Sequence, residues 1–132
     1  MSIETPSGKF TAVELKQIDE ADDLKIAPFR EDGKTYGTPT WVWEVVVNGE
    51  LYVRAYNGTS SRWYEAAIRQ KAGRIHAAGM AKEVVFESVA SSEINQLIDQ
   101  AYQDKYSKSP NMVHMIGGRA KAATIKIVPQ TV

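Results

Sequence analysis

The chain contains no cysteine among its 132 residues. This absence excludes disulfide bridges, thiolate nucleophiles and zinc sites built on cysteine. The sequence also has no net charge, because 16 lysines and arginines balance 16 aspartates and glutamates. No long-range field therefore attracts a polyanion such as nucleic acid, so any site for an anion must be local.

Long apolar runs are missing as well. The longest one, over 41–47, is interrupted by Glu44, and residues 1–10 include no apolar stretch of signal-peptide length. From these absences we expect a cytoplasmic protein that has neither a membrane nor a nucleic acid as a partner.

Familiar catalytic and metal motifs are absent too. His76 and His114 lie far apart in the sequence, and no carboxylates accompany them at the spacing of metal ligands, so we expect no metal site. The order Ser-His-Asp, the P-loop and the GxGxxG motif do not occur, which argues against the usual hydrolase and nucleotide-kinase chemistry. The sequence assigns no catalytic residue.

What the sequence does contain is a series of short elements with regular hydrophobic spacing. A capping box that begins at Thr11 predicts a helix over 12–20. A polar loop followed by helical spacing predicts a second helix over 62–70, ended by Gly73. The serine pair at 91–92 caps a third expected helix, whose apolar residues follow helical spacing closely.

Extended runs separated by turn residues predict the strands. The first three runs, joined by the turns at 31–34 and 48–49, are expected to form an antiparallel meander. The strands are expected over 24–30, 36–47, 50–56, 74–78, 82–89 and 121–128. Six twisted strands with a hydrophobic inner face tend to close on themselves.

These elements together predict the fold class and the domain organisation. We expect an α+β fold, a six-stranded and mostly antiparallel split β-barrel with about three peripheral helices. A chain of this length forms one core, so residues 11–132 are expected to be a single split-barrel domain that follows an N-terminal tail over 1–10.

The segment 54–64 brings several groups that suit a phosphate to the start of the second helix. A helix start carries a partial positive charge and unpaired N–H donors, so it can hold an anion. The segment offers hydroxyl groups, free backbone N–H groups and two arginines, of which Arg54 is the candidate for a fixed guanidinium fork. The alternative is that a serine merely caps the helix, that Asn57-Gly58 forms a turn and that the arginines are solvated.

A second candidate segment is the run Thr38-Pro39-Thr40-Trp41. Pro39 removes a hydrogen-bond donor from a strand, so the run is expected at a sheet edge, at a bulge or where another group approaches the backbone. A flat ring system can stack there. The alternative is a kink with the tryptophans packed in the core.

These runs resemble those of known families. The runs 26–30, 37–41, 52–58 and 61–64 identify a resemblance, from about residue 15 to residue 128, to an uncharacterised bacterial family with a domain of unknown function. More distantly, Thr38-Pro39-Thr40-Trp41 and Trp63-Tyr64 are similar to runs of the deazaflavin-dependent nitroreductases. Those proteins belong to the wider group of split barrels that resemble pyridoxamine phosphate oxidase.

The distant resemblance implies a cofactor and a function. It places a flavin or deazaflavin ring near the backbone of 38–41. It places the phosphate of that cofactor near Arg54, Tyr56, Asn57, Ser60, Ser61 and Arg62. The loop Glu31-Asp32-Gly33-Lys34 is acidic where the deazaflavin binders are basic, which favours FMN, or no cofactor, over deazaflavin. We therefore expect an FMN-binding oxidoreductase that acts on a small molecule. The alternative is a non-catalytic module that binds an anion or a flavin and acts as a sensor.

A homodimer is also expected. Split barrels of this size often pair across the open side of the sheet, and aromatic residues suit such an interface. Trp41, Trp43 and Tyr52 are the candidate interface residues.

Overall fold

The computed structural model describes residues 9–130. It consists of five α-helices, one turn of 3-10 helix (η1, Gly58–Ser60) and one sheet of seven strands, which differs from the six strands and three helices expected. The helices are α1 Ala12–Ala21, α2 Arg62–Gln70, α3 Ser92–Lys105, α4 Met112–Met115 and α5 Gly118–Lys121. The strands are β1 Lys25–Pro28, β2 Thr40–Trp41, β3 Glu44–Val47, β4 Glu50–Arg54, β5 Ala72–Ala77, β6 Met80–Ser88 and β7 Thr124–Pro129.

The three predicted helices are confirmed, with small changes at their ends. At the start of α1, Glu14 N donates to Thr11 Oγ1 at 3.1 Å and Thr11 N donates to Glu14 Oε1 at 2.9 Å, which completes the capping box. α3 begins after Ser91, whose hydroxyl accepts from Ile94 N at 3.3 Å. The segment before the last strand forms α4 and α5. The last strand, expected from residue 121, therefore begins only at Thr124.

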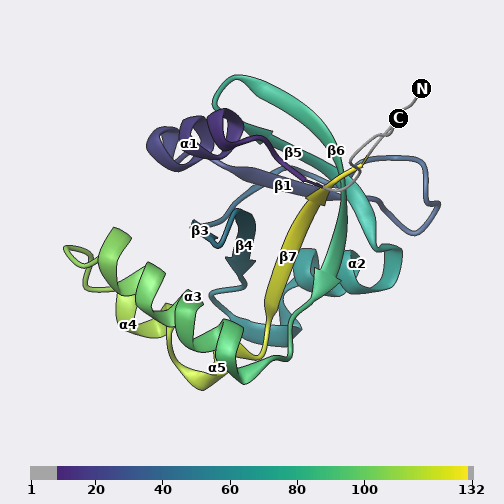
Figure 1. Cartoon of the computed structure of the whole chain (residues 1–132). Coiled ribbons are helices and arrows are strands. Elements are labelled where there is room, and N and C mark those ends of the chain that lie inside the picture. The colour runs from purple at the N-terminus through teal and green to yellow at the C-terminus, as the bar shows by residue number, and fades with distance from the viewer. Residues whose placement is uncertain (1–8, 131–132) are drawn as a thin grey trace.

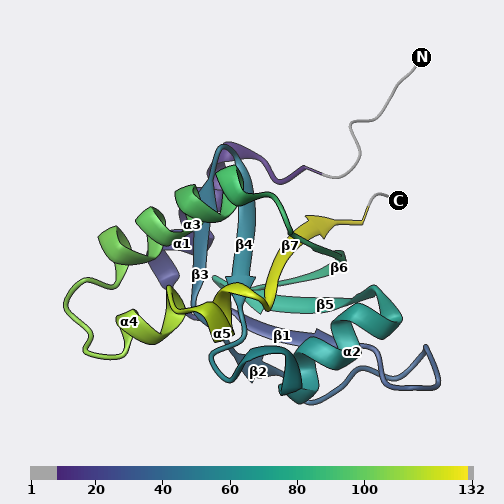
Figure 2. The ribbon, with the colours of Figure 1, turned by 90° about the horizontal axis from the view of Figure 1, so that it is seen from below.

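The seven strands form one curled antiparallel sheet in the order β2-β1-β5-β6-β7-β4-β3. Its two edge strands are neighbours in the sequence, because only Val42 and Trp43 separate β2 from β3. Seven strands laid flat separate the edges by about 29 Å. The three Cα steps from Trp41 to Glu44 span at most about 11 Å. The sheet therefore curls into a half-barrel, and in Figure 2 β3 and β4 run across the direction of β1 and β5.

The predicted strand over 36–47 is the main error in the expected topology. Tyr36 pairs only with Phe29 in an isolated bridge, and 37–39 pair with no strand. The remainder divides into β2, which pairs with β1, and β3, which pairs with β4 at the opposite edge. The expected meander is therefore wrong, because this run crosses from one edge of the half-barrel to the other.

Two predicted hairpin turns are confirmed, whereas the role expected for Gly73 is wrong. Asn48-Gly49 and Ala78-Gly79 have positive φ at both residues, as the tight turns β3–β4 and β5–β6 require. Lys71, with φ of 62°, ends α2 instead of Gly73. Gly73 lies inside β5, where a Cβ atom would come within 2.5 Å of the carbonyl oxygen of Ala27.

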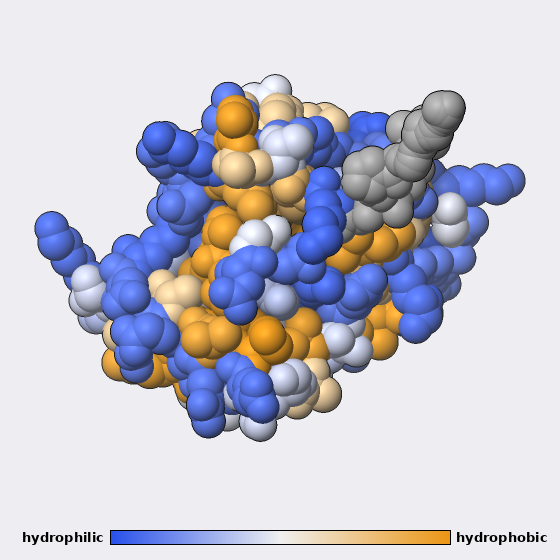
Figure 3. Space-filling view, viewed as in Figure 1, coloured by the Kyte–Doolittle hydropathy of each residue, from blue (hydrophilic) through white to orange (hydrophobic). Residues whose placement is uncertain are grey.

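The core has two parts that lie on opposite faces of the sheet. One part fills the inside of the curl and receives Leu15 and Ile18 of α1 and Ala67 of α2. The other lies between β3–β4 and the helices α3 to α5, with Ile98 and Tyr102 at its centre. Figure 1 shows α1 and α3 on different sides of the sheet, and Figure 3 shows hydrophobic residues around α3 and β7 framed by hydrophilic ones. None of the helices described is long and apolar enough to cross a membrane.

Candidate functional site

A cleft with two lobes opens between the β2 edge of the sheet and helix α2. The lobes are two cavities of about 420 Å³ and about 600 Å³ that share Thr40, Arg62 and Trp63. Both volumes lie in the range of small-molecule sites. The smaller, here the aromatic lobe, is further lined by Trp41, Val42, Trp43, Tyr56, Asn57, Ser61 and Met115. The larger, here the arginine lobe, is further lined by residues 28–32, Gly37, Thr38, Ala66 and Arg69.

The run that links the two sheet edges forms one wall of the aromatic lobe. Trp41 is 73% exposed, and Lys25 Nζ lies 5.3 Å from the centre of its ring. Trp43 is held from behind by Tyr106, because their rings stack at 4.2 Å with an angle of 4°. The wall therefore presents one tryptophan that is free to contact a ligand and one that is fixed.

The start of helix α2 forms the opposite wall. Ser61 is its N-cap residue, with φ of −61° and ψ of 137°, and the Ser61 side chain makes no capping hydrogen bond. The first N–H groups of a helix have no partner within the helix, so they retain a partial positive charge. Ser61, Asn57 and Arg62 line the cavity at this end. The wall thus offers uncapped N–H donors, polar side chains and one guanidinium group.

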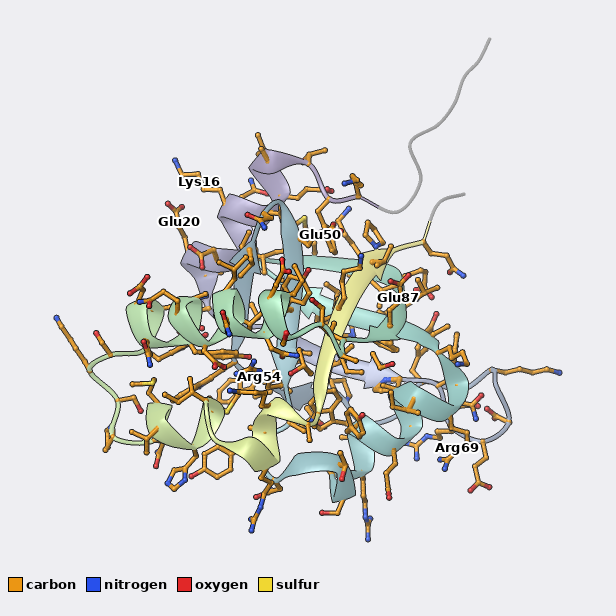
Figure 4. All side chains as sticks on the ribbon, turned by 60° about the horizontal axis from the view of Figure 1, so that its bottom comes forward. Lys16, Glu20, Glu50, Arg54, Arg69 and Glu87 are labelled. Carbon is orange, nitrogen blue, oxygen red and sulfur yellow. The ribbon has the colours of Figure 1, made fainter. Side chains whose placement is uncertain are left out.

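Arg54, one of the predicted phosphate ligands, is assigned by the structure to a different role. Its side chain is 1% exposed and is absent from both lobes. The guanidinium donates to Thr124 Oγ1 (2.9 Å), Asp99 Oδ1 (2.5 Å), the Met115 carbonyl (2.9 Å), and both oxygens of Asn95 (2.9 and 3.2 Å). All five N–H donors of the group are therefore engaged. Figure 4 shows Arg54 between the sheet and α3, where it ties β4 to the helices.

The cleft brings together most of the other predicted site residues. Those that line one or both lobes are Thr38, Thr40, Trp41, Tyr56, Asn57, Ser61 and Arg62. Pro39 and Ser60 line neither lobe, and the Ser60 hydroxyl donates to the Asn57 carbonyl at 3.5 Å.

Sequence reasoning missed several lining residues. Arg69 faces the cleft because it lies seven residues after Arg62, on the same face of α2, and that spacing was a usable signal. Trp43 was considered only for the core or a dimer interface. Met115 comes from an irregular segment whose sequence carries no such signal.

Of the three residues expected at a dimer interface, only Trp41 is well exposed. Tyr52 is buried in the second part of the core, and the partly buried Trp43 packs against the same part. The interface as predicted is therefore wrong for Tyr52. The homodimer itself stays a prediction.

In the acidic loop at 31–34, hydrogen bonds within the loop hold the carboxylate of Asp32. Asp32 accepts hydrogen bonds from Thr35 N (2.8 Å), Thr35 Oγ1 (2.5 Å) and Lys34 N (2.9 Å). The bonds from Thr35 and Lys34 lower the pKa of the Asp32 carboxyl to about 2. The lone pairs of this carboxylate are thus committed to its own loop.

A buried ionic cluster lies behind the aromatic lobe. Glu44 directly follows Trp43, and its side chain is 0% exposed. Lys105 Nζ donates to Glu44 Oε2 and pairs with Asp19 at 2.9 Å, whereas Glu44 Oε1 has no partner. Tyr106 OH donates to Asp22 at 2.6 Å. Burial raises the pKa of the Glu44 carboxyl to about 7 against the opposing effect of Lys105.

Among residues 9–130, no group of three or more histidine, aspartate or glutamate side chains is placed to hold a metal ion. The candidate site is the cleft itself, which is lined by aromatic rings, amide, hydroxyl and guanidinium groups and, in the arginine lobe, the carboxylates of Glu31 and Asp32.

The fold and the cleft define an α+β domain built on a curled antiparallel half-barrel with an open, aromatic-walled cleft. The chain belongs to the family described as an uncharacterized protein conserved in bacteria, DUF2255, whose model matches residues 14–127. This confirms the first of the two resemblances.

The solved structures offer a likeness in fold. The chain is similar to a conserved hypothetical protein, Rv2991, from Mycobacterium tuberculosis, with a TM-score of 0.62 and 13% sequence identity over 96% of this chain and 84% of that one. At this identity the likeness concerns the fold alone. No curated protein matches the chain.

Proposed function

We propose that the cleft binds FMN and that the protein acts as an oxidoreductase on a small oxidised molecule, on a split barrel of the flavin-binding kind. The observation that carries this proposal is that one cavity joins an aromatic wall from Trp41 and Trp43 to the uncapped start of α2. FMN combines a flat apolar ring with an anionic phosphate, and the two walls match these two parts.

The residues of the aromatic lobe suggest how the cofactor is held. Trp41 and Trp63 offer ring faces for stacking from β2 and from α2. Asn57, Ser61 and Arg62 offer donors to an anion at the helix start, and Arg62 pairs with no acidic side chain among residues 9–130. Arg54 takes no part in this proposal.

When bound, FMN supplies hydride and electron transfer. The chain then has to bind the ring, orient it and keep water from one of its faces. No acid or base from the chain is required for this role, which agrees with the composition of the aromatic lobe. Its lining includes no aspartate, glutamate, histidine or lysine.

The same composition favours a second candidate function, a non-catalytic module that binds a flavin or another small anion. A lobe whose lining includes no aspartate, glutamate, histidine or lysine suits the binding of a ligand as well as it suits redox chemistry. The rate at which an acceptor reoxidises reduced FMN separates the two candidates. An oxidoreductase makes this reaction faster for bound FMN than for free FMN, whereas a binding module does not.

An FMN titration tests the cofactor. We expect quenching of flavin fluorescence with a dissociation constant in the micromolar range, and weaker binding of a deazaflavin. The double variant Asn57→Ala, Ser61→Ala should bind FMN about 30-fold less tightly, because it removes two neutral hydrogen-bond partners worth about 1 kcal/mol each. Lys16→Gln on α1, which points away from the cleft, is the control (Figure 4). A protein that leaves FMN fluorescence unchanged contradicts the proposal.

The homodimer is likewise a proposal. The exposed ring of Trp41 is the feature that favours it. Analytical ultracentrifugation of the wild type and of Trp41→Ala tests it. A monomer at all accessible concentrations contradicts it.

A further inference from the structure

The arginine lobe has a chemistry of its own. Three of its lining side chains are arginines, contributed by the loop after β1 and by both ends of α2. Arg62 and Arg69 lie on one face of α2, about 10 Å apart along the helix axis. Figure 4 shows Arg69 projecting from α2 toward the side where the loop after β1 lies.

The loop after β1 holds the third arginine in place. Arg30 Nε donates to the Tyr36 carbonyl at 3.1 Å, and Arg30 N donates to the Thr35 carbonyl at 2.8 Å. At the tip of the loop, a Cβ on Gly33 would lie 3.9 Å from Gln70 Oε1, so the loop packs against the end of α2. Within residues 9–130, the terminal nitrogens of Arg30 make no hydrogen bond or ion pair. The same holds for the side chains of Arg62 and Arg69.

Two acidic residues limit the charge that this lobe accepts. Arg30, Arg62 and Arg69 face Glu31 and Asp32 around the same cavity, which leaves one net positive charge. The Asp32 carboxylate is committed to its own loop, but its charge remains. A singly charged carboxylate balances this net charge, whereas a dianion such as a phosphate monoester leaves one negative charge in the lobe unbalanced. The planar guanidinium also binds a carboxylate in a bidentate manner.

The remaining walls select for a flat apolar body. Phe29, Trp63, Pro28 and Ala66 line the cavity between the charged groups. The ring of Phe29 is fixed from one side, because it stacks on Tyr36 at 4.9 Å. An aromatic ring of a ligand can pack on these side chains while its carboxylate reaches a guanidinium group.

We propose that the arginine lobe is a binding site for a small aromatic carboxylate that carries one negative charge. This ligand can bind in the absence of FMN, but its role as the molecule that the enzyme acts on rests on the proposed function. The lobe joins the aromatic lobe at Thr40, Arg62 and Trp63, so a ligand held here lies next to one held there.

Calorimetric titration with benzoate tests the site. We expect saturable binding with a dissociation constant at or below about 1 mM. Benzamide, which keeps the ring without the charge, and acetate, which keeps the charge without the ring, should each bind about tenfold less tightly. Phenyl phosphate should also bind less tightly than benzoate. Absence of saturable benzoate binding, or equal binding of benzamide, overturns the proposal, and tighter binding of phenyl phosphate overturns the selection for a monoanion.

Variants locate the site. Arg69→Gln and Arg30→Gln, both at exposed positions, should each weaken benzoate binding about tenfold, whereas Lys16→Gln should leave it unchanged. Circular dichroism should show the same thermal transition for all three. Benzoate binding that is unaffected by both arginine variants refutes the location.

The two proposals fail separately. Arg69→Gln changes benzoate binding without changing FMN binding, and the double variant Asn57→Ala, Ser61→Ala does the reverse. If benzoate binds and FMN does not, the site stands and its role in the reaction falls. If FMN binds and benzoate does not, the cofactor proposal stands alone.

Discussion

Glu44 allows a quantitative prediction about how stability depends on pH. Its carboxyl is fully buried, one of its oxygens has no partner, and burial raises its pKa from an ordinary 4.5 to about 7. The native state therefore holds this proton more tightly than the unfolded chain does. The stability that results is fully present below pH 4.5 and is lost as the pH rises through 7.

The size of the effect follows from the shift. A difference of about 2.5 pKa units corresponds to about 3 kcal/mol, at 1.36 kcal/mol for each unit. Most of this contribution to the free energy of unfolding is lost between about pH 4.5 and about pH 8. Glutamine resembles the protonated carboxyl, so the variant Glu44→Gln lacks this loss. Relative to the wild type, the variant should therefore gain up to about 3 kcal/mol across that pH range.

Urea denaturation at a series of pH values measures this difference directly. The comparison of the two proteins cancels the other titrating groups, provided that they respond equally. Glu20→Gln, on the exposed side of α1 (Figure 4), is the matched control and should stay within about 0.5 kcal/mol of the wild type at every pH. A difference between Glu44→Gln and the wild type that is flat, or that falls as the pH rises, refutes the reasoning.

Three further predictions concern stability and are checked by chemical denaturation. Arg54→Met should cost about 3 to 5 kcal/mol, because it removes a buried donor shared by acceptors on α3, α4 and β7; a loss below about 1 kcal/mol contradicts the network. Gly73→Ala should cost about 1 to 3 kcal/mol through its clash with β1, while Gly118→Ala, which meets no atom within 4 Å, should cost nothing measurable. Thr11→Ala should cost about 1 kcal/mol by removing the helix cap, and an unchanged midpoint rules that out.

The parts of the fold that depend on local signals could be predicted from the sequence. The capping box at Thr11 and the hairpin residues Asn48-Gly49 act through neighbouring backbone groups, so their effect is visible within a few residues. The division of 36–47 into two edge strands could not be predicted in this way. It depends on the curl of the whole sheet, which is set by pairings such as β4 with β7, far apart in the chain.

The candidate site was predictable to the same extent. The two segments that line the cleft carry recognisable turn and helix-start residues, so Trp41 and Ser61 could be named in advance. Arg54 was misassigned because the sequence gives no sign that β4 faces α3. Its partners Asn95 and Asp99 come from a helix whose amphipathic pattern was defined by apolar residues alone.

The two-residue link between β2 and β3 bears on how the cleft forms during folding. Val42 and Trp43 reach their positions only after each flanking strand has found its own partner at an opposite edge. Chain closure of this kind comes late, because it depends on contacts between distant parts of the sequence. The cleft therefore forms only once the entire sheet has assembled. A residue inserted into the link should alter the aromatic wall of the cleft more than the pairing of β2 and β3.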